Sequence, residues 1–151
     1  MLRMRPTRAD EVELVAGWES GPDTACWLGE TGLAWHRRAL RDPDVEHLIA
    51  EAEEGRPAGF VVLAGLVEGG GVVELRRLVL GAGFRGAGRG RALLRAAVGR
   101  AYRVHGAARV WLDVKPDNVR ARALYASEGF VPDPAGPAEG LVIMHHGAGT
   151  A

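Results

Sequence analysis

The chain has 151 residues, 47% hydrophobic and 25% charged, with no net charge, which is typical of one folded domain and not of a disordered segment. No apolar run approaches the ~20 residues that a membrane helix requires, and the first ten residues lack the apolar core of a signal peptide, so we expect a cytoplasmic protein with no membrane partner. A single cysteine, Cys26, excludes an internal disulfide and a cysteine-based zinc site, and we expect it to be buried as a small apolar side chain with no metal bound.

The charges are unevenly distributed along the chain. Residues 1–74 hold 7 arginines against 14 acidic residues, whereas residues 75–112 hold 9 arginines and no acid. The division suits an enzyme that holds a polyanionic cofactor with one segment and a cationic substrate with another, although a solvated basic helix would give the same count. We expect no nucleic-acid partner, because Phe84, Tyr102 and Trp111 are not evenly spaced as a stacking platform.

The first part of the chain predicts a strand over residues 2–6, a helix capped by Thr7, a loop over residues 21–23 and a second helix over residues 31–40. Its tryptophans are interpreted first as core residues, since tryptophan buries a large area wherever it lies. The alternative is contact with a cationic acceptor through their ring faces and the acidic residues between them. The candidates are Trp18, Glu19, Asp23, Trp27, Glu30 and Trp35.

Three antiparallel strands are predicted next, over residues 46–53, 58–67 and 72–80, joined by turns at residues 54–57 and 69–71. An amphipathic helix over residues 88–105 and a buried strand over residues 108–114 then complete a right-handed crossover, so that this strand is parallel to strand 72–80. A last helix begins after Asn118 and ends at Gly129, and closing strands follow at residues 130–131 and 141–144. We expect a single domain over residues 1–146 and a flexible tail over residues 147–151.

A glycine-rich turn between strand 72–80 and the following helix is the main candidate site. Glycines at positions 86, 88 and 90 let backbone amides approach a ligand, and the unpaired amides at a helix start favour an anion such as phosphate. Arg85, Arg89 and Arg91 add cations suited to phosphate oxygens. The alternative is a plain tight turn with solvated arginines.

Two motifs carry a family resemblance. Residues 85–90 fit R-x-x-G-x-G, and residues 118–130 fit N-x-x-A-x-x-L-Y-x-x-x-G-F. In this order, with one strand between them, they resemble the acetyl-CoA motif and the following motif of the GNAT superfamily of N-acetyltransferases. The resemblance implies an α/β fold with a mixed, mainly antiparallel sheet of six or seven strands, a splayed parallel central pair and about four helices. It also implies transfer of the acetyl group of acetyl-CoA to a primary amine by direct attack in a ternary complex.

The resemblance further implies roles for individual residues. Tyr125 corresponds to the proton donor for the departing thiolate, Glu74 to a general base found in some members, and Asn118 to a residue that touches the cofactor. The resemblance also implies a bulge that splays strand 72–80 from strand 108–114 and opens a wedge for the pantetheine arm. The backbone of strand 72–80 would pair with this arm, and the amides after it would bind the CoA pyrophosphate. The matching positions are Leu78, Val79 and Leu80 on the strand, then Arg85, Gly86, Ala87, Gly88, Arg89, Gly90 and Arg91.

The chemistry requires such groups independently, because an alkylammonium, with a reference pKa near ~10.4, must lose a proton before its nitrogen can attack a thioester. By the period of two in a strand, Glu74 shares a face with Leu78 and Leu80 and points into the wedge beside the parallel strand. The alternatives remain open: Glu74 pairs with Arg76 or Arg77, Tyr125 packs in the core, and Asn118 caps a helix.

Two other functions compete. Residues 81–86 also fit the dinucleotide fingerprint G-x-G-x-x-G, but Asp113 lies too far on to be its acidic partner, and only one crossover follows. A noncatalytic acyl-CoA sensor of the same fold is the second alternative. We expect the acceptor to be a small-molecule or peptide amine, and the acidic first half of the chain favours a cationic one. We also expect a monomer or homodimer.

Overall fold

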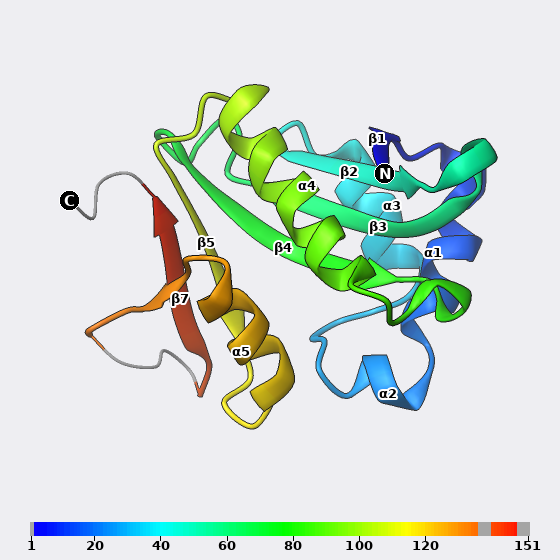
Figure 1. Cartoon of the computed structure of the whole chain (residues 1–151). Helices are drawn as coiled ribbons and strands as arrows, with labels where there is room; N and C mark the ends of the chain where they lie inside the picture. The colour runs from blue at the N-terminus through cyan, green and yellow to red at the C-terminus, as the bar shows by residue number, and fades with distance from the viewer. Residues whose placement is uncertain (1, 136–139, 148–151) are drawn as a thin grey trace.

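The computed structural model describes residues 2–135 and 140–147 and contains one sheet covered by helices on both faces (Figure 1). The described residues form seven strands in the spatial order β1-β2-β3-β4-β5-β7-β6, in which only β4 and β5 are parallel. This confirms the predicted fold class. The strands are β1 Arg3–Pro6, β2 Val45–Glu51, β3 Pro57–Ala64, β4 Val72–Leu80, β5 Arg109–Val114, β6 Val131–Pro132 and β7 Val142–Gly147.

Five α-helices lie within the described residues, whereas we expected about four. They are α1 Val12–Glu19, α2 Pro22–Ala25, α3 Leu33–Arg41, α4 Arg89–Arg103 and α5 Val119–Ser127, with 3-10 turns η1 Ala9–Glu11, η2 Glu53–Gly55 and η3 Ala82–Phe84. The extra helix is α2, where we expected a loop, and it forms because Pro22 at its first position has the backbone angle that a helix start needs. None of these helices is long and apolar enough to cross a membrane.

The two faces of the sheet bury separate apolar clusters. Leu93, Leu94 and Ala97 of α4 pack with Leu75 and neighbouring strand residues on one face, so α4 and α5 cover what we call the α4 face (Figure 1). Val15 of α1 packs with Phe60 and Val79 on the other face, which α1 and α3 cover and which we call the α1 face.

A β-bulge in β4 changes which side chains share a face. Val62 of β3 pairs with Arg77, but Leu63 pairs with Leu75, so Arg76 is an extra residue in β4. Leu75 and Leu78 therefore both pack on the α4 face. In a regular strand they would lie on opposite faces, because they are three positions apart. The prediction that Glu74 shares a face with Leu78 and Leu80 is wrong, because the bulge reverses the alternation between them. Glu74 pairs with Ala64 and lies on the α1 face.

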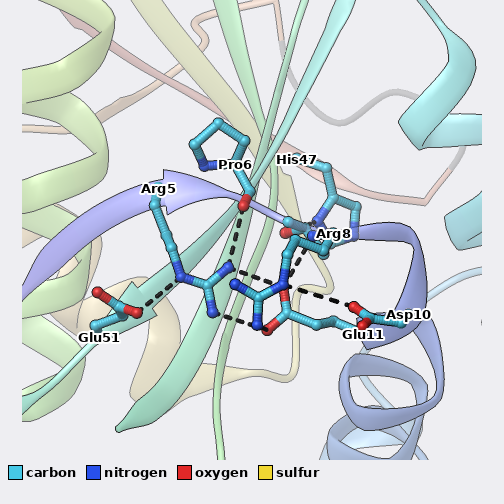
Figure 2. A network of polar contacts seen from close by, with 8 residues as sticks. Arg5, Pro6, Arg8, Asp10, Glu11, His47 and Glu51 are labelled. Atoms are coloured by element: carbon cyan, nitrogen blue, oxygen red, sulfur yellow. Dashed lines mark hydrogen bonds and ion pairs between the residues drawn. The ribbon is translucent and has the colours of Figure 1, made fainter. Parts of the chain in front are cut away.

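Polar contacts fix the start of α1 against the sheet (Figure 2). The Arg5 guanidinium of β1 donates to Glu51 at 2.7 Å and to both oxygens of Glu11 at 2.8 and 2.7 Å. These hydrogen bonds lower the pKa of Glu11 to about 2. Glu11 also accepts from the Arg8 amide at 2.8 Å, so it caps the helix start that we assigned to Thr7.

The Thr7 hydroxyl instead begins a buried polar chain on the α1 face. It lies 2.7 Å from Nδ1 of His47, whose Nε2 lies 2.9 Å from Nδ1 of His36. His36 Nε2 contacts Glu19 Oε1 at 2.7 Å, and Arg77 donates to Glu19 Oε2 at 2.7 Å. Burial, followed by the charge of His36, lowers the pKa of His47 to about 4, so His47 is neutral at neutral pH.

The remaining differences lie in loops and at the chain end. Cys26, expected to be buried, is exposed at the end of α2, because this helix packs no apolar face into either cluster. Gly147, assigned to a flexible tail, is the last residue of β7 and pairs with Arg109. The rest of that predicted tail, residues 148–151, lies outside the described residues.

Replacing Glu19 by alanine should destabilise the fold strongly. The side chains of Glu19 and Arg77 are 0% and 6% exposed, so Glu19→Ala leaves a buried guanidinium without its carboxylate. We expect the free energy of unfolding, measured in urea, to fall by about 3–5 kcal/mol. Glu13→Ala on the exposed side of the same helix is the control and should change it by less than about 0.5 kcal/mol. Equal effects of the two substitutions would contradict a stabilising role for the buried chain.

Candidate active site

The parallel strands β4 and β5 pair over three residues and then separate. Val72, Val73 and Glu74 pair with Arg109, Val110 and Trp111, and the strands diverge beyond them (Figure 1). The edge of β4 from Arg76 to Leu80 that faces β5 consequently has no strand partner among the described residues. A cavity of about 620 Å³ lies there, lined by both strands and by α5.

The glycine-rich turn lies just beyond the end of β4. Gly86, Ala87 and Gly88 have φ angles of 87°, 54° and 75°, three consecutive residues in the left-handed region. The Arg89 amide donates to the Gly86 carbonyl at 3.1 Å, so the amides of Gly90 and Arg91 are those left open at the start of α4. Successive amides in a turn, followed by open amides at a helix start, can bind an anion. This turn lines a second hollow of about 900 Å³ that shares Leu78, Leu80 and other lining residues with the first, so the two form one cleft.

The three arginines of the turn have different partners. Arg91 donates to Ser127 and Glu128 of the α5 end, and Arg95 also pairs with Glu128, so the Arg91 guanidinium ties α4 to α5. Arg85 donates to the Thr24 hydroxyl of α2, and Arg89 lies 5.9 Å from the centre of the Phe84 ring. Arg85 and Arg89 are therefore free of carboxylate partners among the described residues, whereas Arg91 offers chiefly its backbone amide.

Glu74 lies in the cleft and is also paired. Its Oε1 accepts from Arg76 at 3.1 and 2.9 Å, and its side chain is 16% exposed. Because both of these hydrogen bonds go to Oε1, Oε2 is free of Arg76. Glu74 shares the α1 face with Arg77, so it reaches the cavity from the side opposite to Leu78 and Leu80.

Tyr125 reaches the same cavity from the α4 face. Its ring lies 5.9 Å from that of Phe130, centre to centre, and it borders both hollows. The Tyr125 hydroxyl has no hydrogen-bond partner in the part of the chain that the structure describes. Burial, with a further contribution from the Asp113 carboxylate, raises the pKa of Tyr125 to about 12, so the phenol keeps its proton at neutral pH.

Asn118 has a structural role and also borders the cleft. Its side-chain oxygen accepts from the Ala121 amide at 3.3 Å, which caps α5. It lines both hollows, so the capping residue lies where the cleft passes from the splayed strands to the turn.

The candidate acceptor contacts divide into two groups. Asp23, Trp27 and Trp35 line the cavity, although Arg77 lies over the Trp35 ring at 4.1 Å. Trp18 stacks on Phe60, and Glu19 belongs to the buried polar chain, so neither borders the cavity. Glu30 points its carboxylate to Arg38.

Sequence reasoning missed Asp113 as a residue of this site. It lies on β5 two residues after Trp111, which pairs with Glu74, and it lines the cavity. Surrounding protein and the Glu74 carboxylate raise the pKa of Asp113. Alternation along β5 places Asp113 on the face of Trp111, but only the direction of the splay shows that this face opens to the cavity.

Residues 23–27, which we call the α2 segment, border the cleft. Arg85 of the turn donates to Thr24, and Lys115, just after β5, donates to the Cys26 carbonyl. The segment is thereby bonded to both the turn and the end of β5, and its Asp23 and Trp27 line both hollows. No group of three or more metal-ligating side chains gathers among residues 2–135 and 140–147.

Comparisons with known proteins agree with this architecture. Residues 12–130 match the model of the Acetyltransferase (GNAT) family. The fold is similar to that of spermidine N-acetyltransferase from Vibrio cholerae in complex with CoA and spermine, with a TM-score of 0.81 at 15% identity over 95% of this chain and 94% of that chain. A dodecameric structure of spermidine N-acetyltransferase from the same organism has a TM-score of 0.75 at 16% identity over 95% and 92%. A search of curated proteins gives no match.

The parallel pair that opens beside a glycine-rich turn agrees with the family match, which covers residues 12–130. The chain belongs to the acetyltransferase (GNAT) family and is an acetyl-CoA-dependent acyltransferase. The dinucleotide-binding alternative is excluded, since the sheet is mainly antiparallel with a single parallel pair.

Proposed function

We propose that the protein transfers the acetyl group of acetyl-CoA to a cationic primary amine by direct attack in a ternary complex. The observation that carries the proposal is one cleft that joins the amides of residues 85–91 to Glu74 and Tyr125 on opposite faces of the splayed strands. The neighbour of similar fold that was solved with CoA and spermine supports a cationic acceptor.

The turn and β4 would hold the cofactor. Left-handed residues 86–88 suit a pyrophosphate because successive amides in a turn can bind an anion, and Arg85 and Arg89, which have no carboxylate partner among the described residues, add positive charge. The free edge of β4 at residues 78–80 offers main-chain hydrogen bonds to the amides of the pantetheine arm, and Asn118 borders the same path. The bound thioester supplies an acyl carbon that an amine can attack.

Glu74 and Tyr125 would then manage the protons. Glu74 Oε2 accepts one proton from the acceptor ammonium, which frees the nitrogen lone pair for attack on the thioester carbon. The C–N bond forms, the C–S bond breaks, and the departing thiolate takes the Tyr125 proton. Tyr125 is restored by the second proton that the nitrogen loses, and the proton held by Glu74 passes to solvent. The products are the N-acetylamine, CoA thiol and one proton.

Release of CoA thiol from acetyl-CoA across a panel of amines tests this function. We expect cationic alkylamines to be acetylated, with the N-acetyl product identified by mass spectrometry, and anionic amino compounds to react least. Binding of acetyl-CoA without acetylation of any amine in the panel would indicate the noncatalytic sensor instead. A best acceptor with net negative charge would contradict the cationic class.

Gly88→Asp should weaken CoA binding while the fold persists. A side chain at Gly88 meets no atom within 4 Å, but its carboxylate would occupy the turn in which a phosphate must bind. Since charge-assisted hydrogen bonds contribute about 1.5–3 kcal/mol each, calorimetry should show CoA affinity reduced by roughly 10-fold or more. Gly106→Asp is the matched control, because Gly106 also has a positive φ and open surroundings but lies beyond the other end of α4. Equal CoA affinity in both variants would refute the assignment of the turn.

Glu74→Gln and Tyr125→Phe should each lower turnover with CoA affinity nearly unchanged. Both substitutions keep the shape of the side chain and remove one proton-transfer group, which typically contributes ~10²–10⁴ in rate. Tyr102→Phe is the control for the phenol, because the Tyr102 hydroxyl bonds to His146 away from the cleft. If Tyr125→Phe lowers thermal stability but leaves turnover per folded molecule unchanged, the hydroxyl has a structural role only.

A further inference from the structure

The charged side chains that line the cavity are unequally partnered. Its four cations each donate to a protein group: Arg76 to Glu74, Arg77 to Glu19, Arg85 to Thr24 and Lys115 to the Cys26 carbonyl. Two of its three carboxylates, those of Asp23 and Asp113, accept no hydrogen bond within residues 2–135 and 140–147. Arg85 and Lys115 donate to neutral oxygens, so their charges offset those of Asp23 and Asp113 overall, but these two carboxylates are the lining acceptors that remain open to a donor from outside the protein.

Asp113 lies closer to the proposed chemistry than Asp23 does. Asp23 belongs to the α2 segment, whereas Asp113 is on β5 at the point where the two strands have separated. Its carboxylate interacts electrostatically with both Glu74 and Tyr125, and all three side chains line the same cavity. Asp113 thus lies near the two groups that we propose to move protons.

Burial and the Glu74 carboxylate raise the pKa of Asp113, and the charges of Arg76 and Arg77 lower it. These two guanidiniums donate their hydrogen bonds elsewhere, to Glu74 and Glu19, so neither donates one to Asp113 within the described residues. We infer that Asp113 binds the ammonium group of the acceptor and places its nitrogen between Glu74 and the thioester. This inference rests on the proposed function. Asp113 takes no proton in the reaction; it accepts a hydrogen bond from the nitrogen before and after Glu74 removes the first proton. It therefore selects protonated amines over neutral ones.

Asp113→Asn tests the inference because it removes the charge and keeps the size of an exposed side chain. A primary alkylamine, cationic at pH 7, is compared with hydroxylamine, which is neutral at that pH, as acceptors for the wild type and the variant. Loss of a charge-assisted hydrogen bond changes an equilibrium constant by roughly 10- to 150-fold. The kcat/KM for the alkylamine should fall by that factor, mainly through a higher KM. For hydroxylamine it should change by less than about threefold. Asp117→Asn, at an exposed position outside the cavity, is the matched control.

A second readout needs no acceptor. Because the Asp113 charge contributes to the raised pKa of Tyr125, Asp113→Asn in a Tyr102→Phe background should lower the pKa of the remaining tyrosine, followed by ultraviolet absorbance. An unchanged pKa of Tyr125 in the variant would contradict an electrostatic interaction between Asp113 and Tyr125. Equal losses for both acceptors, or no loss for the alkylamine, would overturn the ammonium assignment.

Failure of the proposed function is recognised separately. If the wild type acetylates no amine, binding of the alkylamine to the CoA-loaded protein is measured by calorimetry for the wild type and for Asp113→Asn. Weaker binding in the variant, with CoA affinity unchanged, would still support the ammonium site. Equal binding would refute it.

Discussion

The short parallel contact between β4 and β5 is the constraint on which the rest of the molecule depends. Three residues of β4 pair with β5, and beyond them the facing edge of β4 has no strand partner within residues 2–135 and 140–147, so its main-chain groups can pair with a ligand. An exposed sheet edge is normally a liability. Here the edge is covered on both faces by helices, and a ligand with extended main-chain-like amides can complete it.

The bulge at Arg76 adds a second consequence. Without the extra residue, Glu74 would lie on the same face as Leu78 and Leu80, beside α4 and α5. With it, Glu74 reaches the gap from the α1 face, while Tyr125 reaches it from the α4 face. In the proposed reaction, a gap approached from both faces would separate the acceptor from the leaving group, so the two side chains proposed to transfer protons need not compete for space.

A buried chain of polar side chains supports the cavity wall on the α1 face. Glu19 and His36 are fully buried and hydrogen-bonded to each other. Removing one of these side chains would leave the polar atoms of the other without their partner in an apolar environment. The chain runs from Thr7 after β1 to Arg77 at the cavity wall, so it connects the start of the fold to the site. A stacked Arg77 on Trp35 then fixes that wall.

Strand β4 was predictable with its observed bounds because it depends on a local pattern, and positive φ at Gly86 and Gly88 follows from what glycine permits. A bulge in this strand is implied by the family resemblance, but its position was not predictable. Arg76 and Arg77 interrupt the alternation between Leu75 and Leu78, and that interruption does not show which residue is extra. Nor was the pairing of Arg91 with Glu128 predictable, since it depends on how α4 and α5 approach each other. The place of Asp113 in the cavity was not predictable either, because it depends on the direction in which β4 and β5 separate.

The position of the single cysteine has a practical consequence. Cys26 is exposed on the segment whose neighbours Thr24 and Trp27 border both hollows. The sequence therefore has a single thiol, and this thiol lies beside the cleft. A fluorescent dye attached there would label a single, known place without any engineered substitution, and its emission would report directly on the environment of the segment as the cleft fills and empties.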